Sequence, residues 1–314
     1  MRYSYHTADV FTDQRFGGNQ LAVLTAAEGL TSTDMQLIAR EFNYSETVFV
    51  LPPEDPAHTC RLRIFTPAEE LPFAGHPTIG AAFILTLTGR IATPADDGRV
   101  KVVFEEGAGL VPVEISRTAG RFHAWLTAPR RPETDPDPPS IHTIARVLCL
   151  QPDDLLAGQN APQGVSCGVP FLCVPIRSLA AIRRANVDRA AWLASLADSW
   201  APMICAFTRE TESAEADLHV RVFCPGLGVE EDPATGSAAA TLGAYLAQRD
   251  SRTTGTINFV IEQGIEILRP SRIDVAVDKL DGEIVAVRVG GSAVSVMQGE
   301  IEVGAISQAR QGSG

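Results

Sequence analysis

The sequence predicts an α+β protein of two pseudo-symmetric domains, each a mostly antiparallel sheet rolled around a central helix. Strand-like segments outnumber helix-like ones and do not alternate regularly with them, which argues against a doubly wound sheet. A chain of 314 residues is long enough for two domains of ordinary size. A pattern of strand, turn and apolar helix occurs twice, about half a chain apart, as a duplicated domain requires.

The repeated pattern begins with Arg-x-Phe-x-Pro in both copies, at Arg63 and at Arg221. A turn of small residues follows, Ala-Gly-His-Pro at 74–77 in the first copy and Ala-Thr-Gly-Ser at 234–237 in the second. Each turn leads into an apolar segment that is typical of a buried helix. Two domains related in this way would bring two helix N-termini to face each other across one cleft. The alternative is that two unrelated α+β segments share a Phe-x-Pro and a glycine turn.

A proline-rich stretch at 128–139 is the best candidate for a linker, because proline is poorly compatible with regular elements. We therefore expect domains at residues 1–129 and 130–314, and we allow the terminal strands to cross between them. The other elements expected are a helix behind a capping box at Thr31–Asp34, a helix capped by Ser140, and hairpin strands at Val285–Val289 and Val294–Val296.

The composition is that of a soluble globular protein, with 45% hydrophobic and 20% charged residues. No apolar run reaches the length of a signal peptide core or of a membrane span, so we expect a cytoplasmic protein without a membrane partner. A formal net charge of −12 argues against a nucleic-acid partner, because phosphates are neutralised by clustered Lys and Arg. The six cysteines form no Cys-x-x-Cys motif, and we expect buried thiols in a reducing compartment.

The stretch 228–240 is the most informative local feature of the chain. It joins a strand-like run to an apolar helix, and a helix that starts with small residues presents unpaired N–H groups that suit a carboxylate. Acidic side chains, Glu230, Glu231 and Asp232, crowd the same turn. This combination favours proton chemistry on a small acidic molecule. Asp232 and Ser237 could equally be ordinary helix caps.

Two further candidates for acid–base chemistry lie in the first half. Glu46 sits between an amphipathic helix and a hydrophobic strand, where burial would raise its pKa into a useful range. The alternative for Glu46 is an exposed loop glutamate. His76 lies at a predicted helix start, which favours the neutral imidazole and a hydrogen-bonding role. The alternative for His76 is a capping or packing residue.

Motifs for cofactors and metals are missing from the chain. It contains no Walker loop, no Gly-x-Ser-x-Gly elbow and no His-Glu-x-x-His, and its six histidines lack the spacing of metal ligands. Glu231 stands where the third glycine of a dinucleotide fingerprint would lie. We therefore expect chemistry from carboxylates, histidine and backbone amides, without a cofactor or a metal.

Together these residues resemble the phenazine-biosynthesis PhzF-like family, which shares the diaminopimelate-epimerase fold. The similar segments follow the family order across nearly the whole chain, and the segment at 231–239 is the most specific of them. They are Gly17-Gly18-Asn19, Ser45-Glu46-Thr47, Phe65-Thr66-Pro67, Leu71-Pro72-Phe73-Ala74-Gly75-His76-Pro77, Glu231-Asp232-Pro233-Ala234-Thr235-Gly236-Ser237-Ala238-Ala239, Glu262-Gln263-Gly264 and Gly290-Gly291-Ser292-Ala293-Val294.

The resemblance implies a cofactor-free isomerase, a homodimer, and an active site between the two domains. In the phenazine enzyme of the family a glutamate moves a proton between carbons of trans-2,3-dihydro-3-hydroxyanthranilate. The carboxylate of a small acidic substrate would meet the amides near two glycines. The roles that the resemblance implies are catalytic for Glu46, His76, Asp232 and Ser237, and substrate-binding for Asn19, Gly75, Thr235 and Gly236.

Two departures from related sequences and two alternative functions follow. Diaminopimelate epimerase carries one cysteine in each of the two helix-start loops, and this chain has none in either, so thiol racemisation is disfavoured. An amino-acid epimerase that uses carboxylates, or a catalytically silent metabolite-binding protein, are the alternatives. Gln20 stands where the family usually has proline, which leaves the shape of that loop open.

Overall fold

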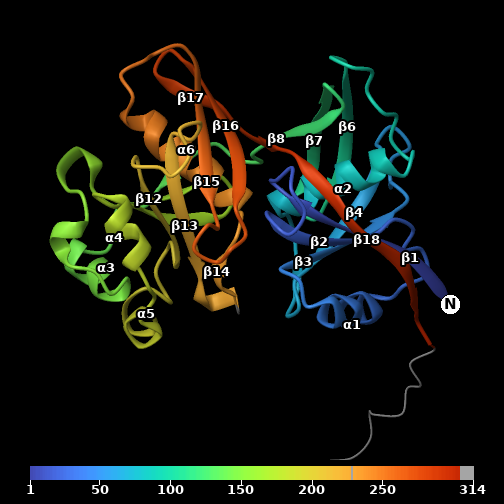
Figure 1. The fold of residues 1–314 in the computed structure, drawn as a ribbon, viewed down its shortest axis with the longest axis horizontal. Coiled ribbons are helices and arrows are strands. Elements are labelled where there is room, and N and C mark those ends of the chain that lie inside the picture. The colour runs from blue at the N-terminus through green and yellow to red at the C-terminus, as the bar shows by residue number, and fades with distance from the viewer. Residues whose placement is uncertain (228, 305–314) are drawn as a thin grey trace, which may run out of the picture.

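The computed structural model describes residues 1–227 and 229–304. Gly228, with which the predicted anion turn begins, and the tail from residue 305 lie outside the described residues. Figure 1 shows two halves side by side, one formed by β1 to β8 with α1 and α2, the other by β10 to β17 with α3 to α6. One apolar helix lies at the centre of each half, α2 in the first and α6 in the second.

The first half contains an outer amphipathic helix and a helix that is buried on nearly all sides. Its strands are β1 Arg2–Val10, β2 Asn19–Leu24, β3 Glu46–Leu51, β4 Cys60–Phe65, β5 Glu70–Leu71, β6 Arg99–Glu106, β7 Gly109–Thr118 and β8 Arg121–Thr127, and its helices are α1 Ser32–Phe42 and α2 Gly75–Leu87.

The second half carries three short outer helices that pack over a separate small core beside β11 and β12. Its strands are β9 Glu133–Thr134, β10 Gln163–Ser166, β11 Pro170–Pro175, β12 Met203–Thr208, β13 Leu218–Cys224, β14 Val229–Asp232, β15 Gly255–Gln263, β16 Ser271–Leu280 and β17 Glu283–Gly291. The last strand, β18 Ala293–Glu302, lies in the first half, beside β1. The helices of the second half are α3 Ile141–Val147, α4 Leu179–Arg184, α5 Arg189–Ser195 and α6 Gly236–Arg249, with short 3-10 turns at Pro152–Asp154, Gly158–Asn160 and Pro225–Leu227.

The two halves have the same strand topology. In the first, β3 lies between parallel β2 and antiparallel β4, and β4 also pairs with antiparallel β5 and parallel β6. In the second, β12 lies between parallel β11 and antiparallel β13, and β13 also pairs with antiparallel β14 and parallel β15. Each central helix follows the short strand, β5 or β14. The predicted fold class of two pseudo-symmetric halves is therefore confirmed.

Equivalent side chains make the same contacts in both halves. The Arg63 guanidinium binds the Glu70 carboxylate through two hydrogen bonds, and Arg221 binds Glu231 in the same bidentate way. Each guanidinium also lies over the phenylalanine two residues later, 5.1 Å from the ring centroid in the first half and 4.9 Å in the second. The repeated Arg-x-Phe pattern thus forms the same ion pair and the same cation–π contact in both halves, so the two segments are structurally equivalent.

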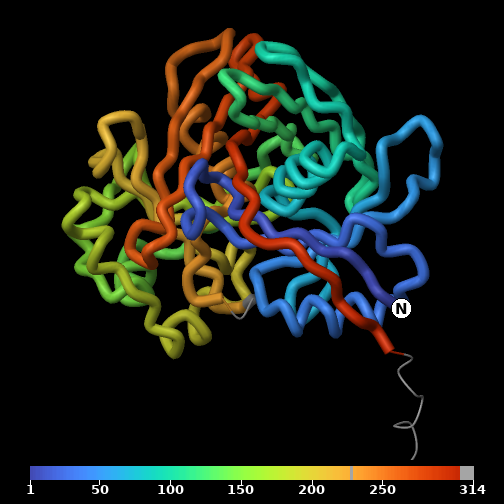
Figure 2. Tube along the Cα trace, turned by 45° about the vertical axis from the view of Figure 1, so that its right-hand side comes forward, coloured from blue at the N-terminus to red at the C-terminus, as the bar shows by residue number. Residues whose placement is uncertain are grey.

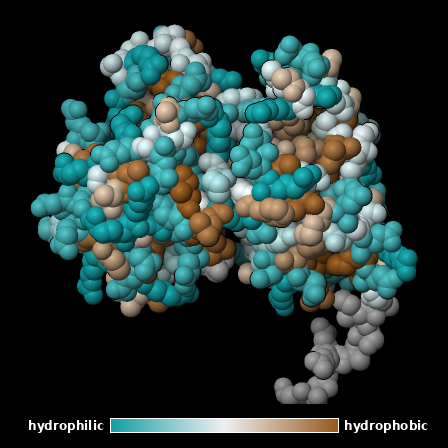
Figure 3. All heavy atoms as spheres, in the orientation of Figure 1, coloured by the Kyte–Doolittle hydropathy of each residue, from teal (hydrophilic) through white to brown (hydrophobic). Residues whose placement is uncertain are grey.

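The halves are joined by strands from distant parts of the chain. β8 pairs antiparallel with β17, and the last strand, β18, crosses back to pair with β1 over nine residue pairs. Figure 2 shows this C-terminal strand running beside the N-terminal strand. In the space-filling view the two halves meet along a furrow with apolar residues beside it (Figure 3). The boundary at residues 129 and 130 stays a prediction.

Local signals for helix starts agree with the structure. Thr31 caps α1 and forms the expected capping box with Asp34, and Ser140 caps α3. Five of the six cysteines are buried as expected, but Cys149 is exposed, so the prediction was wrong for that thiol. Cys149 follows the end of α3 with a positive φ of 55°, and its side chain is exposed although its neighbours Leu148 and Leu150 are buried in the core.

Candidate active site

The N-termini of α2 and α6 touch at the centre of the molecule. A Cβ atom built on Gly75 would lie 3.4 Å from the Cα of Gly236, at van der Waals contact, so the two helix starts lie directly against each other. The residues that precede these glycines, Ala74 and Thr235, are the N-caps of the two helices, and neither provides a side-chain cap. Both first turns therefore keep N–H groups without a capping side chain, and both helix dipoles favour an anion at this point.

Glu46 and His76 approach each other beside these helix ends. Glu46 is the first residue of β3 and His76 the second residue of α2. Glu46 Oε2 lies 3.3 Å from His76 Nε2, and the two side chains are 16% and 6% exposed. Among the described residues, neither of these two atoms has a hydrogen-bond partner. Glu46 is therefore not an exposed loop residue, and its Oε2 is a buried oxygen that faces the His76 ring.

Asn19 connects His76 to Asp232, which belongs to the other half. The Asn19 amide nitrogen donates to Asp232 Oδ1 at 2.9 Å and to the Ala234 carbonyl at 2.9 Å, and it lies 3.4 Å from His76 Nδ1. Asp232 also accepts a hydrogen bond from the Thr235 hydroxyl. Three of the four predicted catalytic residues, Glu46, His76 and Asp232, thus form one cluster that spans both halves.

Burial controls the charge of this cluster. It raises the pKa of Glu46 to about 8, and the nearby Asp232 carboxylate adds to that shift. It lowers the pKa of His76 to about 3, against the opposing effect of a hydrogen bond with the Gln20 backbone. It raises the pKa of Asp232 to about 6, although hydrogen bonds from Thr235, Asn19 and Ser45 oppose the rise. Near neutral pH the Glu46–His76 contact therefore joins two mostly uncharged groups.

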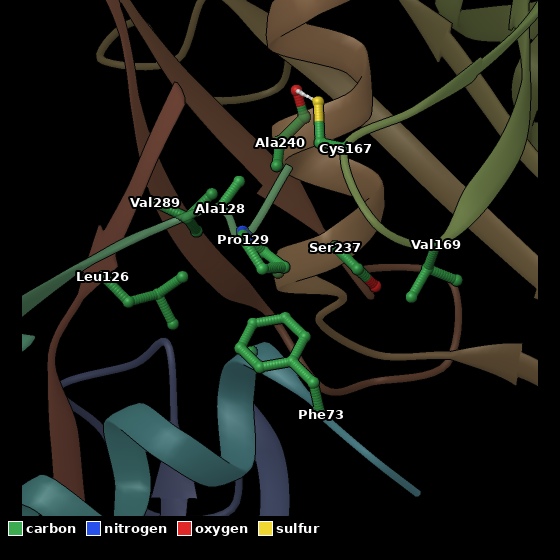
Figure 4. A pocket seen from close by; sticks show the side chains of 11 residues that line it. Phe73, Leu126, Ala128, Pro129, Cys167, Val169, Ser237, Ala240 and Val289 are labelled. Carbon is green, nitrogen blue, oxygen red and sulfur yellow. Dashed lines mark hydrogen bonds between the residues drawn. The ribbon is translucent and has the colours of Figure 1, made fainter. Parts of the chain in front are cut away.

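Ser237 lies one residue beyond Gly236 and lines a pocket at the helix ends. The wall of this pocket is otherwise mostly apolar, and Figure 4 shows the Phe73 ring and the Ser237 side chain projecting into it from the two halves. No direct hydrogen bond between the Ser237 hydroxyl and the Glu46 cluster is present in the described residues. The pocket is lined by Phe73, Gly75, Leu126, Ala128, Pro129, Cys167, Val169, Gly236, Ser237, Ala240 and Val289.

Gln263 holds the turn that carries Asp232, a role that sequence reasoning did not assign. Its amide nitrogen donates to the Asp232 carbonyl at 2.7 Å, and its amide oxygen accepts from the Thr235 N–H at 3.2 Å. The Thr235 hydroxyl lies 3.1 Å from the same amide nitrogen. Thr235 and Asn19, both predicted to bind substrate, are thus engaged in organising Asp232. The motif Glu262-Gln263-Gly264 was the sequence signal that could have identified this support.

The helix starts exclude the N-cap role that was the alternative for three of the site residues. Asp232 and Ser237 are not the N-cap of α6, since Thr235 takes that position. His76 lies within the first turn of α2, where Ala74 is the N-cap. One thiol, Cys224, lies close enough to be influenced by Asp232 and Glu46, but burial raises its pKa well above the usual value and keeps it neutral.

Neither a membrane span nor a metal site is present in the part of the chain that the structure describes. No helix there is long and apolar enough to cross a bilayer. No group of three or more His, Cys, Asp or Glu side chains is arranged to hold a metal ion in residues 1–227 and 229–304.

Comparisons with known proteins agree with the fold. The model of the family described as "Phenazine biosynthesis-like protein" matches residues 8–299. An uncharacterized isomerase of Mesorhizobium japonicum is 41% identical over 95% of this chain and 98% of its own. The trans-2,3-dihydro-3-hydroxyanthranilate isomerase of Pseudomonas aeruginosa is 32% identical over 95% and 98%. The crystal structure of a PhzF-family phenazine biosynthesis protein from Bacillus anthracis superposes with a TM-score of 0.86 at 27% identity, covering 96% of this chain and 100% of that one.

The fold, the buried acid–base cluster and these relatives define an enzyme of the isomerase class. The chain belongs to the phenazine biosynthesis-like PhzC-PhzF family. The resemblance stated from the sequence is thereby confirmed.

Proposed function

We propose that this enzyme moves a proton between two carbons of a small carboxylic acid, without a cofactor, with Glu46 as the general acid and base. The proposed chemistry is of the kind carried out on trans-2,3-dihydro-3-hydroxyanthranilate. The observation that carries the proposal is the buried Glu46 carboxyl, with its raised pKa and an unpartnered oxygen 3.3 Å from His76, beside two abutting helix N-termini.

The substrate carboxylate would bind at the first turns of α2 and α6, near Gly75 and Gly236. Two helix dipoles with free N–H groups favour an anion there, and no lysine or arginine lines the adjoining pocket. The body of the substrate would contact the apolar wall that includes Phe73. The Ser237 hydroxyl, at the same edge of the pocket, would donate a hydrogen bond to a polar substituent of the substrate or accept one from it.

The proton step needs one group that can both take and return a proton. The Glu46 carboxylate would remove a proton from one carbon and, as the carboxylic acid, return it to a second carbon, so the substrate changes its bonding and not its formula. His76, neutral because of its lowered pKa, would hold Glu46 or the substrate by a hydrogen bond. Asp232 would stabilise substrate polar groups from the other half.

The amino-acid epimerase alternative requires a second base on the opposite face of one carbon. Cys224 does not meet this need, since its thiol is buried and neutral. Asp232, with a pKa of about 6, is the only strongly shifted carboxyl beside Glu46 that could do so among the described residues. We retain the isomerase as the proposal, because Asp232 already accepts hydrogen bonds from Asn19 and Thr235. The homodimer and the cytoplasmic location remain predictions.

The test is turnover of trans-2,3-dihydro-3-hydroxyanthranilate by the purified enzyme, followed by absorbance and by mass spectrometry. Conversion to an isomer of unchanged mass is expected. Racemisation of an L-amino acid, with no conversion of the dihydroaromatic acid, would favour the epimerase. Binding of the acid without conversion of either compound would favour the metabolite-binding protein.

A further inference from the structure

Glu106 and Gln263 hold equivalent positions in the two halves. The parallel pairs β4–β6 and β13–β15 place residues 104–107, Phe-Glu-Glu-Gly, in the same register as residues 261–264, Ile-Glu-Gln-Gly. The first glutamates of these segments behave alike. Glu105 accepts hydrogen bonds from two consecutive backbone N–H groups, at 2.7 and 2.9 Å, and Glu262 does the same at 2.6 and 2.9 Å.

The glycines that end these segments also match. A Cβ atom on Gly107 would lie 2.9 Å from the Cα of Pro72, and one on Gly264 would lie 2.5 Å from the Pro233 carbonyl oxygen. In each half the turn after the strand therefore packs on the proline that precedes the central helix. The residue between, Glu106 or Gln263, is placed to hold the start of that helix.

Glu106 reaches the start of α2 through the hydroxyl of Thr78. Thr78 Oγ1 lies 2.7 Å from Glu106 Oε1 and 2.8 Å from the carbonyl oxygen of Ala74, the N-cap of α2. A hydroxyl has one proton and can donate to only one of these oxygens. If Glu106 were ionised, the other short contact would join two oxygens without a proton between them. Both contacts are satisfied when Glu106 donates to Thr78 and Thr78 donates to Ala74.

The second Glu106 oxygen supports the same assignment. Oε2 is buried without a hydrogen-bond partner among the described residues, and the residue is 8% exposed. A carbonyl oxygen of a neutral acid tolerates this position better than a carboxylate oxygen, since an unpaired buried charge is far more costly. Burial also raises the pKa of Glu106 to about 8, which favours the neutral acid.

The titratable group that faces Glu106 from a neighbouring strand is the Cys60 thiol of β4, whose own pKa is raised to about 12 mainly by burial. The adjacent Glu105 points to the other face of β6, where its carboxylate lies 2.7 Å from His58 Nδ1. Arg90 influences Cys60, but it is not among the groups that shift the pKa of Glu106.

We propose that Glu106 is a positioning residue that acts as a neutral carboxylic acid and, through Thr78, fixes Ala74 and the Gly75 end of the anion site. It is the counterpart of Gln263, which fixes Thr235 and the Gly236 end. Because Ala74 directly precedes Gly75, a shift of the Ala74 carbonyl would turn the first N–H groups of α2 away from a bound carboxylate. The inference rests on the proposed function only in treating these N–H groups as substrate ligands.

The test compares Glu106→Gln with Glu106→Leu and Thr78→Val in the full chain. Glutamine keeps the shape and donates to Thr78 without ionising, so it should retain wild-type hydrogen–deuterium exchange at the α2 start and wild-type KM. Leucine at 106 and valine at 78 should speed exchange of the amide of residue 78, which donates to the Ala74 carbonyl, by about tenfold and raise KM more than they lower kcat. Affinity for 3-hydroxyanthranilate, an unreactive aromatic analogue, should fall in parallel.

Two further measurements keep the proposal falsifiable. The infrared difference between wild type and Glu106→Gln at pH 7 should contain the carbonyl band of a protonated carboxyl group, since Glu46 is common to both proteins. Glu105→Gln, the matched control on the opposite face of β6, should leave exchange of the residue-78 amide unchanged. Exchange in Glu106→Gln as fast as in Glu106→Leu, or no protonated band, would overturn the proposal. These readouts need no turnover, so they stand apart from the proposed reaction.

Discussion

Glu46 and Met203 occupy equivalent positions in the two halves: each is the first residue of its strand, and each is paired with a parallel neighbour, Leu21 or Phe171, at the same register. The proposed acid–base residue therefore has a methionine as its counterpart. The duplicated framework has been kept while the chemistry has diverged.

The second carboxylate shows the opposite asymmetry. Asp232 pairs with Val222 in β13, and the residue with the same register in the first half is Leu71, which pairs with Ile64. Each half thus contributes one carboxyl group that the other half lacks. A complete site exists only where the two halves meet, and we expect neither half to be active alone.

Asp232→Asn should reduce kcat/KM by about 10²-fold and weaken substrate binding. Asparagine has an NH2 group in place of one carboxylate oxygen, so the hydrogen bonds that Asn19 and Thr235 donate to the two oxygens cannot both be accepted. Steady-state kinetics measures both effects. The control is Glu230→Gln, two residues earlier and exposed. Equal losses in the two variants would point to a general effect of charge and not to the contacts of Asp232.

The rate should depend on pH through Glu46. If Glu46 begins the reaction as the base, only its ionised fraction is active below its pKa of about 8. We expect kcat/KM to rise by about tenfold per pH unit between pH 6 and 7.5 and to level off above pH 8. A profile that is flat over this range would show that Glu46 is not the base.

The stability of the fold should also depend on pH through Glu46, but it should fall as the pH rises, whereas kcat/KM should rise. The folded-state pKa of Glu46 is raised from 4.5 to about 8, so between these values the folded protein binds more protons and its stability falls as the pH rises. Glu46→Gln removes this loss and should raise the free energy of unfolding by about 1 kcal/mol or more at pH 8, with little change at pH 4.5. Chemical denaturation at the two pH values provides the comparison, and a pH-independent difference would contradict it.

Gly264→Ala should destabilise the protein and displace Asp232. A Cβ atom there would lie 2.4 Å from the Arg269 carbonyl oxygen and 2.5 Å from that of Pro233, at a φ of +78°. We expect a loss of at least about 3 kcal/mol in the free energy of unfolding. Gly282→Ala is the matched control, since its φ is +88° and no atom lies within 4 Å of the new methyl group. It should cost about 1–2 kcal/mol, and similar losses in both variants would leave only backbone strain as the cause.

Local sequence patterns predicted much of the fold, because short-range chemistry determines them. The Thr31–Asp34 capping box and the Arg-x-Phe-x-Pro repeats depend on neighbours within a few residues. The pairing of β1 with β18 could not be predicted in this way, since a strand pattern does not reveal its partner across nearly three hundred residues. The sequence was compatible with terminal strands that cross between the domains, but it did not indicate which strands pair.

In the site, too, the features set by neighbouring residues could be predicted and those set by long-range contacts could not. Glu46, His76 and Asp232 were identified as candidates from local chemistry and family resemblance, but the Asn19 bridge between them depends on distances that only the folded chain sets. The support from Glu106 was missed, because Glu-Glu-Gly at 105–107 and Glu-Gln-Gly at 262–264 become comparable only once strand register aligns them. The equivalence of Glu106 and Gln263 can be recognised from the strand pairing, but not from the sequence alone.

The most direct test of the account is turnover of trans-2,3-dihydro-3-hydroxyanthranilate in heavy water by wild type, by Glu46→Gln and by the exposed-surface control Glu41→Gln. Mass spectrometry would follow deuterium in the product and calorimetry would follow binding of 3-hydroxyanthranilate. We predict that wild type and Glu41→Gln place deuterium on the carbon that gains hydrogen, whereas Glu46→Gln binds normally and turns over at least about 10²-fold more slowly. Turnover by Glu46→Gln at a near-wild-type rate would contradict the assignment of Glu46 as the proton carrier.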